Sequence, residues 1–218
     1  MTERTLDVTI VPVTPFGQNC SVLSHAPSKT AVVVDPGGDV PLILEAVKKL
    51  GVTVQAIWLT HGHIDHAGGA AEFKEALGGV PIEGPDLRDK FLLDALPENG
   101  RKFGILTARA VTPDRWLAEG DTLKLADLEF SALHVPGHTP GSLVYFNAAN
   151  RFLLAGDTLF QGSVGRTDMP YGDAKALVDS IRAKIFTLGD DVTFLPGHGQ
   201  HGTIGEERRS NPFAGERQ

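Results

Sequence analysis

The chain has 218 residues, with 20 Lys or Arg against 27 Asp or Glu, a formal net charge of −7, one Cys and eight His. A chain of this length can bury roughly 70% of the surface that its unfolded form exposes, so we expect one domain over residues 1–218. A single Cys excludes an internal disulfide, and no run approaches 18 apolar residues, which excludes a membrane-spanning helix. The negative charge argues against nucleic acid as main partner, and without an apolar leader at its N-terminus we expect a cytoplasmic protein.

The first half of the chain alternates short strands with helices. Its apolar pattern predicts five strands, over Val8–Val13, Cys20–Ser24, Thr30–Asp35, Gln55–Leu59 and Val80–Glu83. One helix is predicted from an N-cap at Asp39 through Leu50, where Gly51 ends the 3.6-residue period, and a second over Ala67–Leu77. Strands alternating with helices are typical of an α/β domain.

The segment from Pro85 to Val111 is less regular. It holds an apolar island at Phe91–Leu93 and a turn at Pro97–Gly100. Long excursions in compact domains are often functional, so one interpretation is a lid over a site. The other is an ordinary helix followed by a surface loop.

Strands resume after Asp114. Five are predicted, over Thr122–Leu125, Glu129–His134, Ser142–Phe146, Arg151–Ala155 and Val192–Leu195. Ala174–Leu188 reads as a long helix and Ile204–Ser210 as a polar tail segment. Two successions of strands followed by helix suggest two sheets face to face with helices outside, an α/β or α+β layered architecture.

Metal-ligand residues gather after the strands. Three His and an Asp follow strand Gln55–Leu59 within six residues, at His61, His63, Asp65 and His66. Imidazole with carboxylate is the donor set that suits Zn²⁺ and related divalent ions. One such cluster leaves coordination spheres incomplete, and further candidates with Gly beside them do follow other strands, at His138, Asp157 and His198. The remaining histidines have other expected places: His25 and His201 at the surface, and His134 either behind a ligand or packed at a strand end.

The pattern His61-x-His63-x-Asp65-His66, followed by His138, Asp157 and His198, resembles the seven-ligand signature of the metallo-β-lactamase superfamily, in its glyoxalase II branch. The chain is similar to short single-domain bacterial glyoxalase II-like hydrolases in five further segments, Pro15-Phe-Gly-Gln-Asn-Cys20, Asp35-Pro-Gly-Gly38, Thr112-Pro-Asp-Arg-Trp116, Gly165-Arg-Thr-Asp168 and Asn211-Pro-Phe213. This resemblance implies a four-layer αββα sandwich with the ligands on loops at one edge of the two sheets.

The resemblance also implies two divalent ions, most commonly Zn²⁺, with Fe or Mn as alternatives. The implied ligands of the first ion are His61, His63 and His138. Those of the second ion are Asp65, His66 and His198. Asp157 would bridge the two ions. Two such ions lower the pKa of a water bound between them, so that it becomes hydroxide near neutral pH and can attack a carbonyl. Asp65 is the implied catalytic group, orienting that hydroxide or accepting its proton.

Three more residues have expected roles. Asp35 is either a hydrogen-bond acceptor behind a ligand His or a turn residue before Pro36. Arg166 lies where the resemblance implies a basic contact to glutathione, and the alternative is a surface arginine. Gln200 replaces the substrate-contacting Tyr of the glyoxalase II pattern. Cys20 is far in sequence from the ligand clusters, so we expect a buried apolar residue and not a catalyst.

The leading functional hypothesis is therefore a thioester hydrolase for hydroxyacylglutathiones such as S-lactoylglutathione. The alternative is a persulfide dioxygenase of the same fold, with one Fe(II) on His61, His138 and Asp157. His66 disfavours a β-lactamase, because that branch typically carries Arg there. The negative charge disfavours a nuclease or phosphodiesterase, and retention of all seven ligands disfavours a non-catalytic metal-binding protein.

Overall fold

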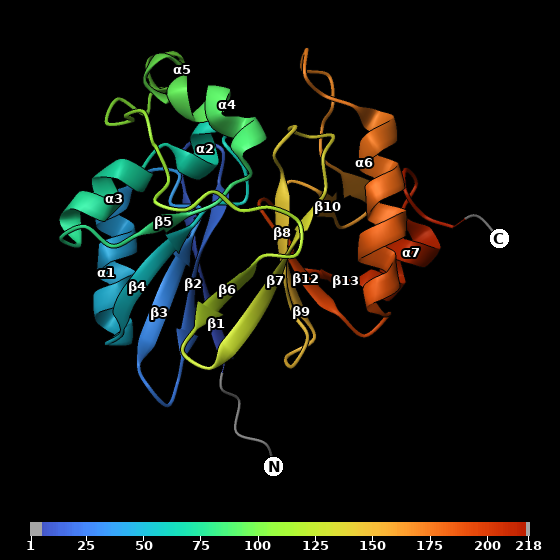
Figure 1. Ribbon diagram of the computed structural model, residues 1–218, viewed down its shortest axis with the longest axis horizontal. Coiled ribbons are helices and arrows are strands. Elements are labelled where there is room, and N and C mark those ends of the chain that lie inside the picture. Colours follow the sequence, from blue (N-terminus) through green and yellow to red (C-terminus); the bar gives the residue numbers. More distant parts are fainter. Residues whose placement is uncertain (1–5, 217–218) are drawn as a thin grey trace.

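A computed structural model describes residues 6–216, which form two sheets with helices outside them (Figure 1). The first sheet has the order β1-β2-β3-β4-β5, with β1 Leu6–Val13, β2 Gln18–His25, β3 Thr30–Val34, β4 Thr53–Trp58 and β5 Ile82–Glu83. The second has the order β13-β12-β9-β8-β7-β6, with β6 Thr122–Leu125, β7 Leu128–His134, β8 Leu143–Asn147, β9 Phe152–Gly156, β12 Thr193–Pro196 and β13 Gly202–Thr203. A separate ribbon pairs β10 (Leu159–Phe160) with β11 (Ser163–Val164).

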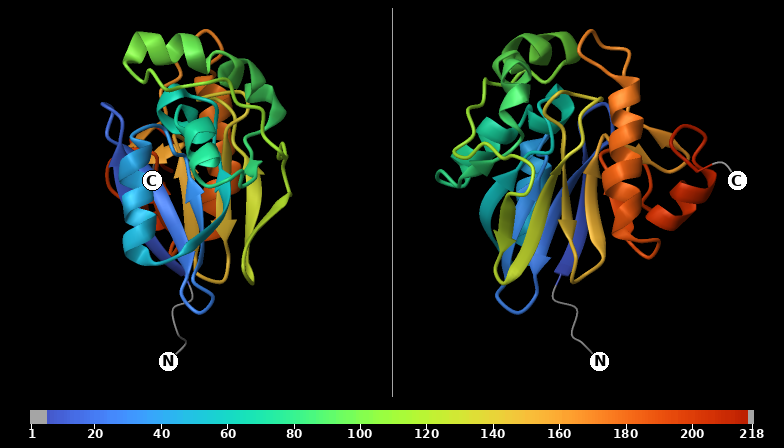
Figure 2. Two further views of the ribbon diagram at one scale, coloured as in Figure 1. Left: turned by 90° about the vertical axis from the view of Figure 1, so that its left-hand side faces the viewer. Right: turned by 45° about the vertical axis from the view of Figure 1, so that its right-hand side comes forward.

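Helices cover the outer faces of both sheets and one end of the sandwich (Figures 1 and 2). The first sheet carries α1 (Val40–Leu50) and α3 (Ala70–Ala76). The second carries α6 (Ala174–Ser180), which continues as a π turn and a 3-10 turn to Leu188, and α7 (Ile204–Ser210). At the upper end in Figure 1 lie α2 (Ile64–Ala67), α4 (Lys90–Asp94) and α5 (Leu96–Phe103), with a 3-10 turn at Leu87–Asp89 before α4.

Three hydrophobic layers hold this arrangement together. In β3 the side chains alternate, so that Ala31 and Val33 pack under α1 and α3, while Val32 and Val34 face the second sheet. The middle layer also contains Trp58 and the other large residues of the sheet interface, and the third layer packs β9 and β12 against α6. The two-residue period of each strand thus supplies both faces of a sheet buried on both sides. The expected four-layer architecture is confirmed.

Two glycine-containing turns meet backbone to backbone beside α2. A Cβ at Gly37 would overlap the carbonyl oxygen of Asp65, and one at Gly69 would lie 2.6 Å from the carbonyl oxygen of Pro36. The amide of Gly69 donates to that same Pro36 oxygen at 2.9 Å. Glycine is needed here because any side chain would separate the two turns. The helix predicted over Ala67–Leu77 is present as α3, but it begins at Ala70, because this contact separates it from α2, which ends at Ala67.

All ten predicted strands are present, with ends shifted by at most two residues, whereas β10, β11 and β13 were not predicted. The predicted polar tail at Ile204–Ser210 is a helix, α7, whose first residue is fully buried. The segment 85–111 contains two short helices, α4 and α5, and lies closer to the helix-and-loop interpretation in its local structure.

Two side-chain predictions need correction. Asp39 is the N-cap residue of α1 as predicted, but its side chain makes no capping bond; its carboxylate accepts instead from the amide of Thr14 at 2.7 Å. Its left-handed backbone points the side chain away from the helix. His25 is buried, not at the surface, because it ends β2 at the sheet interface and its Nε2 lies 3.0 Å from the Asp127 carboxylate.

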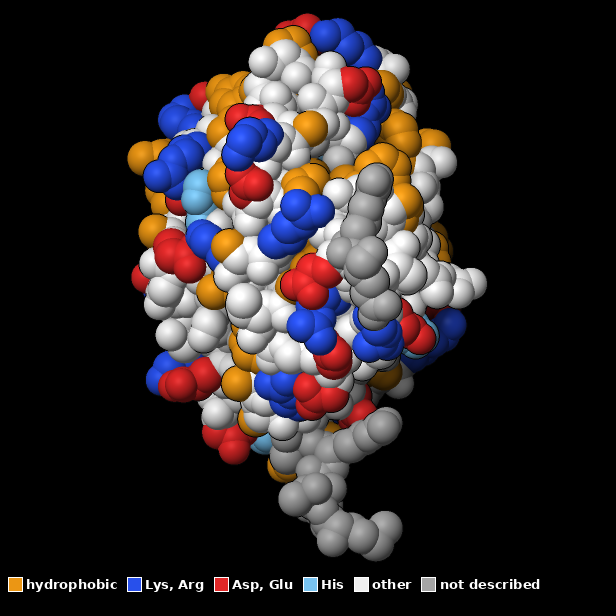
Figure 3. All heavy atoms as spheres, turned by 90° about the vertical axis from the view of Figure 1, so that its right-hand side faces the viewer, with side chains coloured by type: hydrophobic (Ala, Val, Ile, Leu, Met, Phe, Trp, Pro, Cys, Tyr) orange, Lys and Arg blue, Asp and Glu red, His pale blue; other side chains and the backbone are white. Residues whose placement is uncertain are grey.

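The face carrying α6 and α7 shows Lys or Arg interspersed with Asp or Glu (Figure 3). Several of these charges are paired, as in Lys175–Asp179 at 2.5 Å and Arg208–Asp190 at 2.8 Å. Exposed pairs of this kind contribute little stability but prevent a patch of one sign. Within residues 6–216, no helix has both the length and the apolar character needed to span a bilayer.

Cys20 lies in the core between the first sheet and its helices and has no exposed surface. Burial raises the pKa of its thiol well above the usual value, and the nearby charge of Asp35 adds to this rise. Because the thiolate is the reactive form, we expect a thiol reagent at pH 8 to leave Cys20 unlabelled in the native protein. Labelling should become complete in guanidinium chloride, and fast labelling without denaturant would show that Cys20 is accessible.

Candidate metal centre

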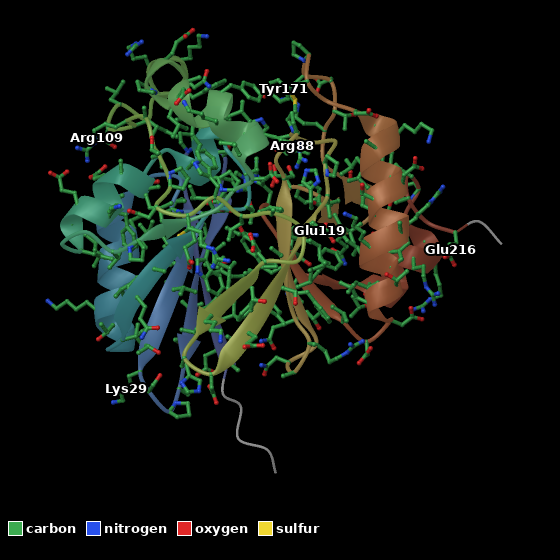
Figure 4. All side chains as sticks on the ribbon, viewed as in Figure 1. Lys29, Arg88, Arg109, Glu119, Tyr171 and Glu216 are labelled. Carbon is green, nitrogen blue, oxygen red and sulfur yellow. The ribbon has the colours of Figure 1, made fainter. Side chains whose placement is uncertain are left out.

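All seven predicted ligand residues lie at one end of the sandwich, on loops that follow strands. His61 and His63 follow β4, and α2 carries Asp65 and His66. Three further loops supply the rest, with His138 after β7, Asp157 after β9 and His198 after β12. Their backbones are joined directly, as where the amide of Gly197 donates to the carbonyl of Gly156 at 2.8 Å. A hollow lined by Lys29 and other residues at the opposite end of the sheets includes none of the seven (Figure 4).

Three histidines form one half of the site. Nε2 of His61 lies 3.1 Å from Nδ1 of His63, and Nε2 of His138 lies 2.9 Å from the same atom. The three nitrogens are close enough to coordinate one metal ion. Each ring directs its other nitrogen elsewhere: Nδ1 of His61 to the Thr60 hydroxyl at 3.0 Å, and Nδ1 of His138 to the Arg166 carbonyl at 2.8 Å. Such partners fix which ring nitrogen is free to bind a metal.

Asp65, His66 and His198 form the other half and could also coordinate one ion. Nε2 of His198 lies 3.1 Å from Asp65 Oδ2. Asp157 lies between the halves, with Oδ1 3.3 Å from His66 Nε2 and Oδ2 3.6 Å from His138 Nε2. The structure therefore brings all seven residues together and places Asp157 where a bridging carboxylate is expected.

The two halves differ in charge. In the first half, burial and the neighbouring imidazoles lower the histidine pKa values, that of His61 well below its usual range and that of His63 to about 3. Burial likewise lowers the pKa of His138. These three rings are neutral at neutral pH, so their nitrogen lone pairs are available to a cation.

In the second half, the carboxylates dominate. Burial alone lowers the pKa of His66, but the charges of Asp157 and Asp65 outweigh it and raise that pKa well above the usual value. The pKa of His198 is raised against burial by the same two carboxylates, Asp65 first. Burial favours a protonated Asp157, yet the adjacent histidines, His66 above all, hold its pKa well below the usual range. A metal ion here competes with protons on His66 and His198.

The buried atoms fit a cation. Nε2 of His66 and Oδ1 of Asp157, 3.3 Å apart, are two of the five buried side-chain atoms without a hydrogen-bond partner among residues 6–216. An unpaired buried polar atom is costly, and a metal ion would satisfy both. Gly197 adjoins this point, where a Cβ would overlap Asp157 Oδ1. Side-chain exposure falls from 28% at His198 to 12% at Asp157, so the site opens to solvent on the His198 side.

Asp35 lies behind the site, as one of its two sequence interpretations expects. Its Oδ2 is 2.9 Å from Nδ1 of His66 and accepts the Thr60 hydroxyl at 2.6 Å, while Oδ1 accepts the Thr60 amide at 2.8 Å. Asp35, His61 and His66 are also close enough to form a ligand group. Both Asp35 oxygens thus accept hydrogen bonds, and Oδ2 faces the ring nitrogen of His66 on the side away from Asp157.

The guanidinium of Arg166 is exposed and makes a bidentate pair with Asp168, both bonds 2.7 Å. No hydrogen bond joins this guanidinium to the seven residues in the structure of residues 6–216. Its backbone carbonyl is the part of Arg166 that contacts a ligand residue, His138. The ring of His134 bonds the Pro140 carbonyl through Nε2 at 2.8 Å and not the side chain of a ligand residue.

Sequence reasoning missed two residues of the site. Asp89, just before α4, is fully buried and accepts the amides of Gly62 at 2.9 Å and Gly141 at 2.6 Å and the hydroxyl of Thr139 at 2.7 Å. It thus joins two ligand loops, although burial raises its pKa to about 6. Tyr171 lies with its hydroxyl 2.9 Å from Nε2 of His63. The only sequence signal for Asp89 was its place in the irregular segment 85–111, and Tyr171, between a predicted strand and a predicted helix, had none.

Replacing Asp89 with Asn should destabilise the metal-free protein. Asn has nearly the same volume as Asp, but its NH₂ group cannot accept the hydrogen bonds that Asp89 receives, so buried N–H or O–H groups are left unpaired. We therefore expect the free energy of unfolding to fall by about 2–4 kcal/mol. Urea denaturation measures this. Asp94→Asn is the matched control, because Asp94 pairs with Lys90 at the exposed surface and its loss should cost less than about 1 kcal/mol. Equal losses in the two variants would contradict the role assigned to Asp89.

Comparisons with known proteins agree with this geometry. The family profile described as the metallo-beta-lactamase superfamily matches residues 13–198. The chain is 44% identical over 209 residues to hydroxyacylglutathione hydrolase GloC of Haemophilus influenzae, covering 95% of this chain and 98% of that relative. Two solved structures superpose closely: the B3 metallo-β-lactamase BLEG-1 (TM-score 0.87, 35% identity, 95% of this chain and 99% of that one) and TTHA1623 in a di-iron-bound form (TM-score 0.84, 34% identity, 94% and 100%). The expected resemblance is confirmed, and the chain belongs to the metallo-β-lactamase superfamily.

Proposed function

We propose that this protein is a metal-dependent hydrolase of hydroxyacylglutathione thioesters, with His61, His63 and His138 as one ligand trio, Asp65, His66 and His198 as the other, and Asp157 between them. The observation that carries the proposal is the pair of buried, partnerless atoms on His66 and Asp157 at the junction of the two trios. The similarity to a relative named hydroxyacylglutathione hydrolase supports the substrate class.

Two divalent cations, when bound, supply hydroxide near neutral pH and polarise the thioester carbonyl. The chain itself must then manage protons and access. Asp65 is the carboxylate for proton transfer, because its side chain is 16% exposed whereas that of Asp35 is 4% exposed and fully hydrogen-bonded. The more exposed His198 marks the side from which the thioester enters.

The donor set admits more than one metal. Five imidazoles and two carboxylates suit Zn²⁺ and also iron or manganese. The similarity to a protein solved in a di-iron-bound form supports iron as the main alternative to zinc. The competing proposal of a persulfide dioxygenase needs one Fe(II) on His61, His138 and Asp157. The presence of a second trio at the same centre favours the hydrolase.

The deciding experiment is elemental analysis of the purified protein combined with two assays. We expect about two divalent ions per chain. We also expect hydrolysis of S-lactoylglutathione, which the assay detects as release of free thiol. Oxygen uptake with glutathione persulfide by the iron-loaded protein, without thioester hydrolysis, would replace our proposal with the dioxygenase.

Asp157→Ala should remove the carboxylate shared by the two trios. We expect the metal content to fall and thioester turnover to drop about a hundredfold or more, because both ions lose a ligand. Elemental analysis and the thiol assay measure the two effects. Asp179→Ala removes an exposed carboxylate that pairs with Lys175 and should change neither. Full activity with two metals retained in Asp157→Ala would exclude the binuclear proposal.

Arg166→Ala tests the glutathione contact. A guanidinium that binds an anionic thiol carrier contributes to substrate affinity, so KM for S-lactoylglutathione should rise about tenfold. KM for a small uncharged thioester should stay near the wild-type value. Asp168→Asn is the control, because it frees the guanidinium from its bidentate partner and should not raise KM. An equal rise for both substrates in Arg166→Ala would exclude Arg166 from the substrate site.

A further inference from the structure

The two ring nitrogens of His63 face different surroundings. Nδ1 points into the site, 3.1 Å from His61 Nε2 and 2.9 Å from His138 Nε2. Nε2 points out of it, 2.9 Å from the hydroxyl oxygen of Tyr171. A neutral imidazole carries one proton, so Nδ1 can offer a lone pair to a metal only when that proton is on Nε2. The Tyr171 oxygen is then the acceptor of the Nε2–H group.

The loop that carries Tyr171 serves two ligand histidines at once. It leaves β11 and runs from Gly165 to α6, and it is fixed at both ends, where Gly165 N donates to Thr158 O at 3.1 Å and Asp173 N to Gly137 O at 2.8 Å. The carbonyl of Arg166 in this loop faces Nδ1 of His138 at 2.8 Å. One loop therefore supplies the outer partner of two of the three histidines in the first half of the site.

Tyr171 is also held from the side. Its ring contacts that of Phe91 edge to face, with centroids 5.2 Å apart and planes at 71°. Phe91 belongs to α4, directly after the buried Asp89 that joins the two ligand loops. Figure 4 shows Tyr171 at the upper end of the molecule, where α4 approaches the loops of the second sheet. Packing against Phe91 thus positions the Tyr171 hydroxyl. The Tyr171 ring is half-buried, so a substitution here should not disrupt the hydrophobic core.

We propose that Tyr171 is a positioning residue that holds His63 in the metal-binding tautomer and orientation through its hydroxyl. The three outer partners of the first half are a threonine hydroxyl, a backbone carbonyl and this phenol. Thr60 is tied to Asp35 and the carbonyl belongs to the main chain, so Tyr171 is the partner that a substitution can remove alone. The inference rests on the proposed metal site but not on the proposed substrate.

Tyr171→Phe deletes the hydroxyl and keeps the ring. We expect the tighter Zn²⁺ binding step to weaken about tenfold, since loss of a ligand's outer partner typically costs ten- to hundredfold in affinity. Competition between the protein and a chromophoric chelator for Zn²⁺ measures this without substrate. The thermal unfolding midpoint of the metal-free protein should not change. In the zinc-loaded wild type, the His63 Nε2–H proton should exchange slowly by NMR, and in Tyr171→Phe it should exchange faster.

Phe91→Leu is the matched variant, since it removes the aromatic contact but leaves the hydroxyl. We expect it to weaken Zn²⁺ binding less than Tyr171→Phe does. Wild-type zinc affinity in Tyr171→Phe, or an equal loss in Phe91→Leu, would overturn the assignment to the hydroxyl. If the wild type binds zinc but does not hydrolyse thioesters, the proposed function fails while the role of Tyr171 stands. If the wild type binds no divalent metal, both fail.

Discussion

The site depends on a parallel strand pair in each sheet, β3–β4 in the first and β9–β12 in the second. Parallel pairing puts the carboxyl ends of neighbouring strands at the same edge, where ligands commonly bind in α/β proteins. Here the two sheets meet at that edge, and Gly156 at the end of β9 is so close to Thr60 after β4 that a Cβ would lie within 2.9 Å of the threonine side chain. The loops after β4, β7, β9 and β12 therefore lie side by side, and each places its ligand residues in the same centre within a few residues of the strand end.

The sequence predicted what periodicity and residue type encode locally. The alternation of apolar residues predicted the strands, and the cluster of histidines after β4 predicted the first metal ligands. Features formed by distant partners were not predictable in this way. Asp89 lies 27 residues from Gly62 and 52 from Gly141, and Tyr171 lies 108 from His63. The side-chain cap expected from Asp39 is absent for the same reason, because its carboxylate accepts from the amide of Thr14, 25 residues away. Arg166 looked important for its side chain, yet its carbonyl touches a ligand residue.

The contrast in charge between the two halves has a consequence for how a metal would be bound. The trio of His61, His63 and His138 is neutral because burial lowers each histidine pKa, so a cation entering it displaces no protons at neutral pH. In the trio with Asp65, the carboxylates of Asp157 and Asp65 raise the pKa values of His66 and His198. Binding there releases protons and is opposed by falling pH. Protons therefore compete with a cation more strongly at His66 and His198 than at the first trio.

The segment between β5 and β6 is more than an ordinary connection, even though its helices are short. Through Asp89 it joins the loop of His61 and His63 to the loop after His138, and through Phe91 it packs on Tyr171, which faces His63. All of these contacts reach the first half of the centre. A displacement of α4 large enough to admit a substrate would have to preserve the Asp89 bonds or disturb the backbone between two ligands. The next helix, α5, is anchored separately, by the buried Leu96 and Gly100, and its Phe103 contacts Phe16 at the exposed surface. The helix α4 therefore belongs to the frame that holds the site, whereas the lid interpretation of the rest of the segment stays a prediction.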